Sequence, residues 1–203
     1  MSISTEDRER ISNAIRAAEA KTSGEIVCVL AETSSSATAL PVFLAAVGAL
    51  ALPWALMTLT AMPVYRILSL QVAAFIILMG ILYWTPVRVA LMPRRVRRAV
   101  AHRVAMEQFE IRGLARKHDR TGILIFVSLA ERYARIIADE GISARVPRSQ
   151  WQAAVDVLIV HMREGRTAEG FVEAIDLCGD QLAQHFPRTE ASRRELPDRI
   201  YLI

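Results

Sequence analysis

The chain has 203 residues, of which 53% are apolar, and a formal net charge of +4. Its mean hydropathy of +0.27 is too high for an average soluble domain, and its length is too short for a large transporter. The charge is unevenly distributed, because residues 88–120 sum to +7 whereas residues 1–36 and 121–203 sum to −2 each. The basic excess is therefore local.

A short amphipathic helix followed by a buried strand is predicted at the start of the chain. Ser4 or Thr5 can cap the helix, and acidic residues fill its first turn. Residues 25–31 (EIVCVLA) are almost continuously apolar, which is typical of a strand covered on both faces. Because one strand cannot stand alone, its partners are expected later in the chain.

The next segment, residues 37–87, carries a single charged side chain, Arg66. The uncharged runs on either side of Arg66 each reach the roughly 20 residues that a helix needs to cross the hydrocarbon core of a bilayer. We predict a transmembrane hairpin with helices at about 38–60 and 67–88. A signal peptide is a weaker interpretation because a helix and a strand precede the run. A buried core hairpin is also weaker because the flanking segments are strongly charged.

Arginines follow the second predicted span closely, and positive charge next to a span sets its orientation. They are Arg88, Arg94, Arg95, Arg97, Arg98 and Arg103. This pattern predicts a multi-pass protein of the bacterial inner membrane with both termini in the cytoplasm. The arginines are expected to contact anionic lipid headgroups. Nucleic-acid binding is disfavoured because no set of stacking aromatic residues accompanies them.

An amphipathic helix is predicted from Pro93 to Lys117. Its apolar residues fall within about a quadrant of the helical wheel: Val96, Val100, Val104, Ile111, Leu114 and Ala115. Glu107 falls in the same quadrant, and we interpret it as a side chain at the exposed rim rather than a buried functional acid.

The remaining sequence predicts two strands, two helices and a short edge strand. Residues 123–127 and 133–139 read as antiparallel strands because a short connection joins them. One helix is expected after Ser149 and another after Thr167, and residues 199–203 can add the edge strand. Cys28 and Cys178 fall on apolar positions, which favours two free, buried thiols.

Several segments, in this order, resemble the TPM-domain family, whose name comes from a thylakoid lumen protein, a photosystem II repair protein and a receptor modulator. They are TSGEIV (22–27), RTGILIFVS (120–128), ARIIADEGI (134–142) and the helix that carries Gly165, Gly170 and Phe171. The resemblance implies an α/β fold, a role in partner binding or membrane-protein maintenance and, in some relatives, weak phosphatase activity or a calcium site.

These observations give one expected architecture. A small mixed sheet is sandwiched by helices in a discontinuous domain, residues 1–36 and 93–203, and the transmembrane hairpin, residues 37–92, is inserted after the first strand. Family members are commonly exported, whereas the charge pattern here keeps the domain in the cytoplasm. The hairpin also occupies the loop where relatives have a short acidic connection.

Carboxylates at the ends of predicted strands are the candidate metal ligands: Asp119 before one strand, and Asp139 and Glu140 after the next. Oxygen ligands suit calcium or magnesium, but the sequence does not fix the strand register that would bring them together. The simpler interpretation is a turn and a solvated loop. No P-loop, nucleophile elbow or HExxH motif is present.

We therefore expect a non-catalytic module that presents its domain to a membrane-protein partner, with self-association as a further option. The alternative is a metal-dependent phosphatase.

Overall fold

The computed structural model describes residues 3–34, 39–60, 62–84, 90, 92–114, 120–188 and 196–203. The chain forms two compact units. The first unit joins Met1–Ser34 to Arg98–Ile203, and the second is Ser35–Arg97. The first unit is thus assembled from segments on both sides of the second.

The first unit contains a four-stranded sheet in the order β3-β2-β1-β4. The strands are β1 (Glu25–Ala31), β2 (Gly122–Ser128), β3 (Tyr133–Ala138) and β4 (Ile200–Leu202). β1 pairs in parallel with β2 and β4, and β2 pairs antiparallel with β3. Every residue of β1 and β2 is buried, which explains their continuous apolar sequences. The mixed sheet, the antiparallel pair and the short edge strand are confirmed.

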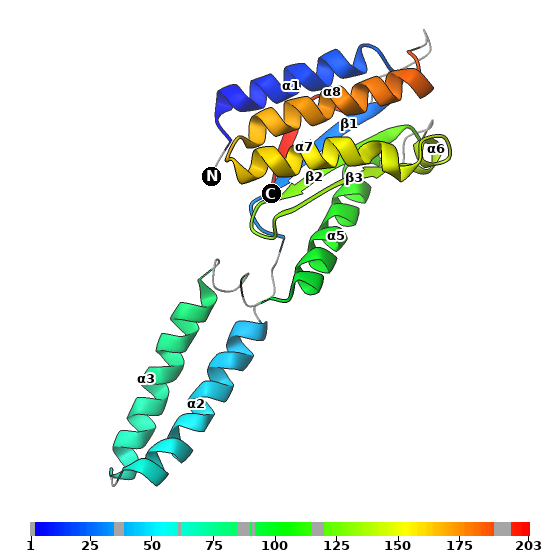
Figure 1. The fold of residues 1–203 in the computed structure, drawn as a ribbon. Coiled ribbons are helices and arrows are strands. Elements are labelled where there is room, and N and C mark those ends of the chain that lie inside the picture. The colour runs from blue at the N-terminus through cyan, green and yellow to red at the C-terminus, as the bar shows by residue number, and fades with distance from the viewer. Residues whose placement is uncertain are drawn as a thin grey trace. The chain divides into compact units, whose positions relative to one another are not determined.

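Three long helices cover one face of this sheet: α1 (Thr5–Glu19), α7 (Gln152–Arg163) and α8 (Thr167–His185) (Figure 1). Ser4 caps α1 and forms a reciprocal capping box with Asp7. α1 packs closely against α8 at Gly179, where an added Cβ would lie 2.7 Å from the Cβ of Ala18. Cys28 and Cys178 are both free and buried in the resulting core, as predicted.

A short helix and a 3-10 helix connect the sheet to α7. α6 (Glu140–Ser143) begins directly after β3, and the 3-10 helix η2 (Arg148–Trp151) precedes α7. Ser149 was predicted to cap the helix that follows, but it lies inside η2, whose N-cap is Pro147. Proline fixes a backbone conformation that suits the entry to a helical turn, so no side-chain cap is needed there.

The opposite face of the sheet is covered by α5 (Arg94–Ile111). This helix ends six residues before the predicted end at Lys117, because Gly113 adopts a left-handed conformation with φ of 78°. Its buried residues are Ala101, Ala105 and Phe109 rather than the predicted quadrant. Small alanines allow the helix to approach the sheet closely.

The predicted apolar quadrant of α5 lies beside the buried face. Val96 and Ile111 are 45% and 68% exposed, and Val104 packs at the edge of the core. Leu114 is buried as predicted, whereas Ala115 lies outside the described residues. Glu107 is exposed, in agreement with the rim interpretation.

The second unit contains two apolar helices, α2 (Ala39–Leu59) and α3 (Val64–Tyr83), which pack against each other as a hairpin. Both are long and apolar enough to cross a membrane, with 11% and 6% of their span residues buried. α3 begins three residues earlier than predicted and ends at Tyr83 rather than near 88. Arg66 therefore lies in the first turn of α3 instead of the connecting turn, because Pro63 supplies the N-cap.

Candidate functional site

A buried hydrogen-bond cluster ties the carboxyl end of β1 to the turn between β2 and β3. Both oxygens of Glu131 accept hydrogen bonds, Oε1 from the Thr33 hydroxyl at 3.2 Å and Oε2 from the Ser34 backbone N–H at 3.0 Å. The Ser128 hydroxyl also donates to Glu131 Oε2. The Ser34 hydroxyl donates to Ser128 Oγ at 2.9 Å. We call these four residues the Glu131 cluster.

The Glu131 cluster has the properties of a structural hydrogen-bond network. Ser34, Ser128 and Glu131 are 8%, 0% and 5% exposed, and each carboxylate oxygen of Glu131 already accepts from a neighbour. The Ser128 hydroxyl lies beside a carboxylate, but it is buried and therefore cannot contact a substrate. The cluster fixes the chain at the point where it leaves the sheet for the inserted hairpin.

Sequence reasoning missed the Glu131 cluster, because Glu131 was interpreted only as part of a short connection. The available signal was an acidic residue three positions after a buried strand, with two hydroxyl residues shortly after another strand. The carboxyl ends of parallel strands lie at the same end of a sheet, so the sequence could have predicted that these residues lie close together.

A second buried acidic group lies at the amino end of β1. Glu19, at the end of α1, is 5% exposed, and its Oε1 accepts the backbone N–H of Ile26 at 2.7 Å. The pKa of Glu19 is raised from 4.5 to about 8, mainly by burial; the Ile26 N–H lowers it, and the nearby carboxyls of Asp198 and Glu25 raise it. At neutral pH, Glu19 is therefore mainly a neutral acid.

Asp198 links this acidic group to the helix surface. Arg16 Nε lies 3.5 Å from Asp198 Oδ2, and the Ser12 hydroxyl donates to the Asp198 carbonyl oxygen. An ion pair and a hydrogen bond thus hold the segment that precedes β4 against α1.

The predicted metal ligands have separate roles in the described residues. Asp139 caps α6 by accepting the Glu140 backbone N–H at 2.7 Å, and its own N–H donates to the Gly122 carbonyl oxygen. The carboxylate of Glu140 pairs with Arg120. Asp119 lies outside the described residues.

The register places Asp139 opposite Gly122, at the same sheet end as Arg120. Asp139 is 8% exposed, and its Oδ2 atom has no hydrogen-bond partner among the described residues. Within residues 120–188 and the other described ranges, no group of three His, Cys, Asp or Glu side chains could hold a metal ion. Since one carboxylate oxygen is too few for calcium or magnesium, the metal site stays a prediction that depends on Asp119.

The predicted membrane-surface arginines are partly described. Arg94, Arg95, Arg98 and Arg103 of α5 are exposed, and Arg97 is half-buried. Arg88 lies outside the described residues. The exposed guanidinium groups are free to meet an anionic surface.

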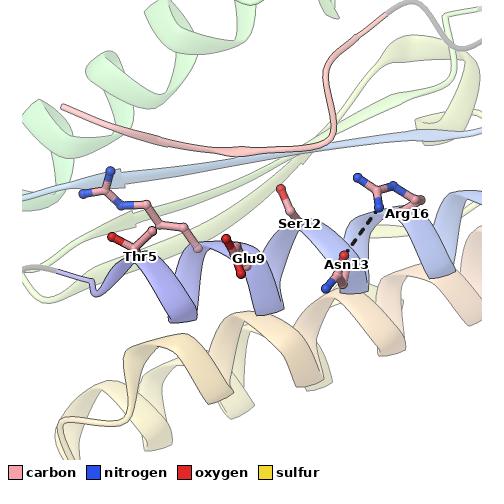
Figure 2. A pocket seen from close by; sticks show the side chains of 6 residues that line it. Thr5, Glu9, Ser12, Asn13 and Arg16 are labelled. Atoms are coloured by element: carbon pink, nitrogen blue, oxygen red, sulfur yellow. Dashed lines mark hydrogen bonds between the residues drawn. The ribbon is translucent and has the colours of Figure 1, made fainter.

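A shallow groove of about 350 Å³ follows one stripe of α1. It is lined by Thr5, Arg8, Glu9, Ser12, Asn13 and Arg16, and Figure 2 shows the C-terminal strand running past the same stripe. α1 and β4 are neighbours in the fold, so the groove lies next to the edge strand of the sheet. Its lining is polar, with two arginines and one glutamate.

Comparison with known proteins agrees with this architecture. Residues 85–181, which include α5 and the helices and strands as far as α8, match the sequence profile of the TPM domain. This part of the chain is similar to a TPM domain. The matched region begins after the hairpin, and the structure adds α1, β1 and β4 to the same folded unit.

A solved structure has a similar fold. It is the NMR structure of the BA42 protein from the psychrophilic bacterium Bizionia argentinensis, with a TM-score of 0.63 and 20% sequence identity. The alignment covers 100% of this chain and 96% of BA42. No curated protein matches the sequence. The sequence match thus points to the TPM domain, and BA42 shows that the fold is shared with a solved structure; the two apolar helices lie between β1 and the matched region.

Proposed function

We propose that this chain is a membrane-anchored protein whose TPM domain binds a protein partner at the cytoplasmic face of a bacterial inner membrane. The observation that carries the proposal is the insertion of two span-length helices between β1 and α5 of a single folded domain. Both ends of the hairpin connect to the same domain, so the proposed anchor is an internal insertion rather than a segment at one end of the domain.

The surface of the helical hairpin supports a lipid environment. Large apolar side chains are exposed along both helices, including Phe43 at 63%, Trp54 at 77% and Ile76 at 64%. An apolar surface of this extent is rarely left in contact with water. A bilayer would cover it, and two helices satisfy their own backbone hydrogen bonds there.

The orientation follows from the charge of the segment after α3. The exposed arginines of α5 favour the cytoplasmic side, where each can gain about 1 kcal/mol from anionic headgroups. The connection between α2 and α3 would then face the outside. A partner in membrane-protein maintenance is consistent with what the TPM resemblance implies.

The topology can be tested with introduced cysteines, because the native Cys28 and Cys178 are both buried and give little background. Met62→Cys lies between the two helices, and Glu164→Cys lies at the exposed end of α7. A membrane-impermeable maleimide added to intact spheroplasts should label the first variant only. Labelling of Glu164→Cys without lysis, or of neither variant after lysis, would reject the proposed orientation.

Partner binding can be tested separately by chemical crosslinking in native membranes followed by identification of the captured proteins. A specific membrane protein that is captured by the full chain, but not by a chain that carries the hairpin alone, would support the proposal. Capture of the same proteins by both chains would contradict it.

A metal-dependent phosphatase is the second candidate, favoured by the buried Oδ2 of Asp139, which has no hydrogen-bond partner in the described residues. Phosphatase assays with calcium, magnesium or manganese should compare the wild type with Asp119→Ala and Asp139→Asn. Asparagine keeps an oxygen that can cap α6 but removes the negative charge. Metal-dependent turnover that is lost in both variants would replace the binding-only function with catalysis.

A further inference from the structure

The strand β4 forms an open edge of the sheet in the described part of the chain. Ile203 bonds to β1 through both backbone groups, since its N–H donates to Leu30 at 3.0 Å and its carbonyl accepts from Glu32 at 2.9 Å. The backbone N–H and C=O groups of successive residues in a strand point alternately to opposite sides. Those of Tyr201 therefore also point toward β1, and those of Ile200 and Leu202 point away from it.

Both sides of this edge carry arginines. On the side of α1, Arg8 and Arg16 line the groove described above. Figure 2 shows Ser12 and Asn13 on the same helix beside Arg16. On the other side, the ring of Tyr201 lies beneath two guanidinium groups. Arg112 is 3.8 Å and Arg199 is 4.8 Å from the ring centroid.

The charge around the edge is positive in sum. Near this edge the described residues include these four arginines and the carboxylates of Glu9, Glu32 and Asp198, and Asp198 is already paired with Arg16. Arg8 is exposed on the groove. Successive side chains of an added strand point to opposite faces, so acidic residues of such a strand would meet Arg8 on one face and Arg112 and Arg199 on the other.

We propose that the free edge of β4, between the groove on α1 and the arginines that stack on Tyr201, binds an extended acidic segment of a protein partner by strand addition. Main-chain hydrogen bonds to Ile200 and Leu202 would supply part of the affinity, and the arginines would select the acidic sequence. The inference rests on the proposed partner-binding function and assigns it a surface and a partner chemistry.

The test uses the full chain in detergent and a fluorescein-labelled octapeptide in which pairs of glutamates alternate with pairs of valines, so that glutamates point to both faces of an added strand, with binding followed by fluorescence anisotropy. An octapeptide in which pairs of lysines alternate with pairs of valines is the charge control. Leu202→Pro removes the outward N–H while leaving the bonds of Ile203 to β1 intact, and proline is tolerated on an edge strand. Leu202→Ala is its matched control, because it keeps the N–H and shortens the side chain.

The acidic peptide should bind the wild type and Leu202→Ala, and Leu202→Pro should lose about tenfold or more in affinity. Arg8→Glu should weaken binding by about tenfold, whereas Arg10→Glu, which lies outside the groove and pairs with Asp7, should change it less than about twofold. Arg8 is exposed, so its variant keeps the inference testable even if Leu202→Pro does not fold.

Any of three results would overturn the inference: no binding by the folded wild type, equal binding of the lysine peptide, or unchanged affinity of Arg8→Glu. Concentration-dependent dimers that Leu202→Pro abolishes, without peptide binding, would assign the edge to a second copy instead. If membrane partners are still captured by the folded Leu202→Pro variant, the proposed function stands and this surface is rejected.

Discussion

Glu19 provides the strongest test of the energetics of this domain. Its carboxyl group is buried between α1, the start of β1 and the segment before β4, and burial raises its pKa from 4.5 to about 8. The folded protein therefore holds a proton that the unfolded chain releases at a lower pH. Stability should fall as pH rises from about 5 toward 8, and it should become independent of this group above the folded pKa.

The magnitude follows from the two pKa values. Each unit of difference corresponds to 1.36 kcal/mol, so the loss of stability between pH 5 and pH 8.5 is about 4 kcal/mol as an upper bound. Glu19→Gln should remove this dependence, because the amide is neutral at every pH and its oxygen can still accept the Ile26 N–H. The variant should be more stable than the wild type at pH 8.5.

Urea unfolding of the full chain in detergent can measure this difference. Trp54 and Trp84 are exposed on the second unit, whereas Trp151 is buried in the core of the first. Replacing the first two with phenylalanine leaves Trp151 as the reporter of domain unfolding. If wild type and Glu19→Gln lose stability in parallel between pH 5 and pH 8.5, the assigned role of Glu19 is wrong.

Three further outcomes are expected. Glu131→Ala should destabilise the domain by about 2–4 kcal/mol in the same urea assay, because two buried donors, the Ser34 N–H and the Ser128 hydroxyl, lose their acceptor. Ser128→Ala should cost about 1 kcal/mol, and equal costs of the two variants would contradict the cluster. Gly179→Ala should lower Tm, and adding Ala18→Gly should restore it unless α1 and α8 do not meet there. Burial raises the pKa of the Cys28 and Cys178 thiols, so Ellman's reagent should react only after urea unfolding, and rapid native reaction would contradict their burial.

Local patterns predicted most of the elements. The continuous apolar runs of β1 and β2 identified strands that are buried on both faces, and the short connection before Tyr133 identified the antiparallel pair. The long uncharged segment predicted the two apolar helices, because hydropathy over about 20 residues is a strong signal. These features depend only on residues that are close in sequence.

The errors have tertiary causes. The helical wheel predicted that the valines of α5 form its buried face. In the structure, Ala101, Ala105 and Phe109 pack against the sheet instead, because close packing depends on side-chain shape as well as on hydrophobicity. The Glu131 cluster and the Glu19 group each join segments that are far apart in the chain. Their assembly depends on strand order and register, which local periodicity does not contain.

The position of the hairpin also sets an order of events during synthesis. The central pairing of β1 with β2 joins Cys28 to Ile125, roughly a hundred positions later, so β1 must wait for its partner for about 5–20 s at ordinary elongation rates. During that interval α2 and α3 emerge, and their pairing brings the two ends of the inserted segment to the same end of the hairpin. The hairpin thereby shortens the effective loop between β1 and β2 before the sheet forms. If the hairpin inserts into a bilayer as proposed, insertion is a folding step for the domain, and delayed insertion would leave β1 as an unpaired, aggregation-prone apolar strand.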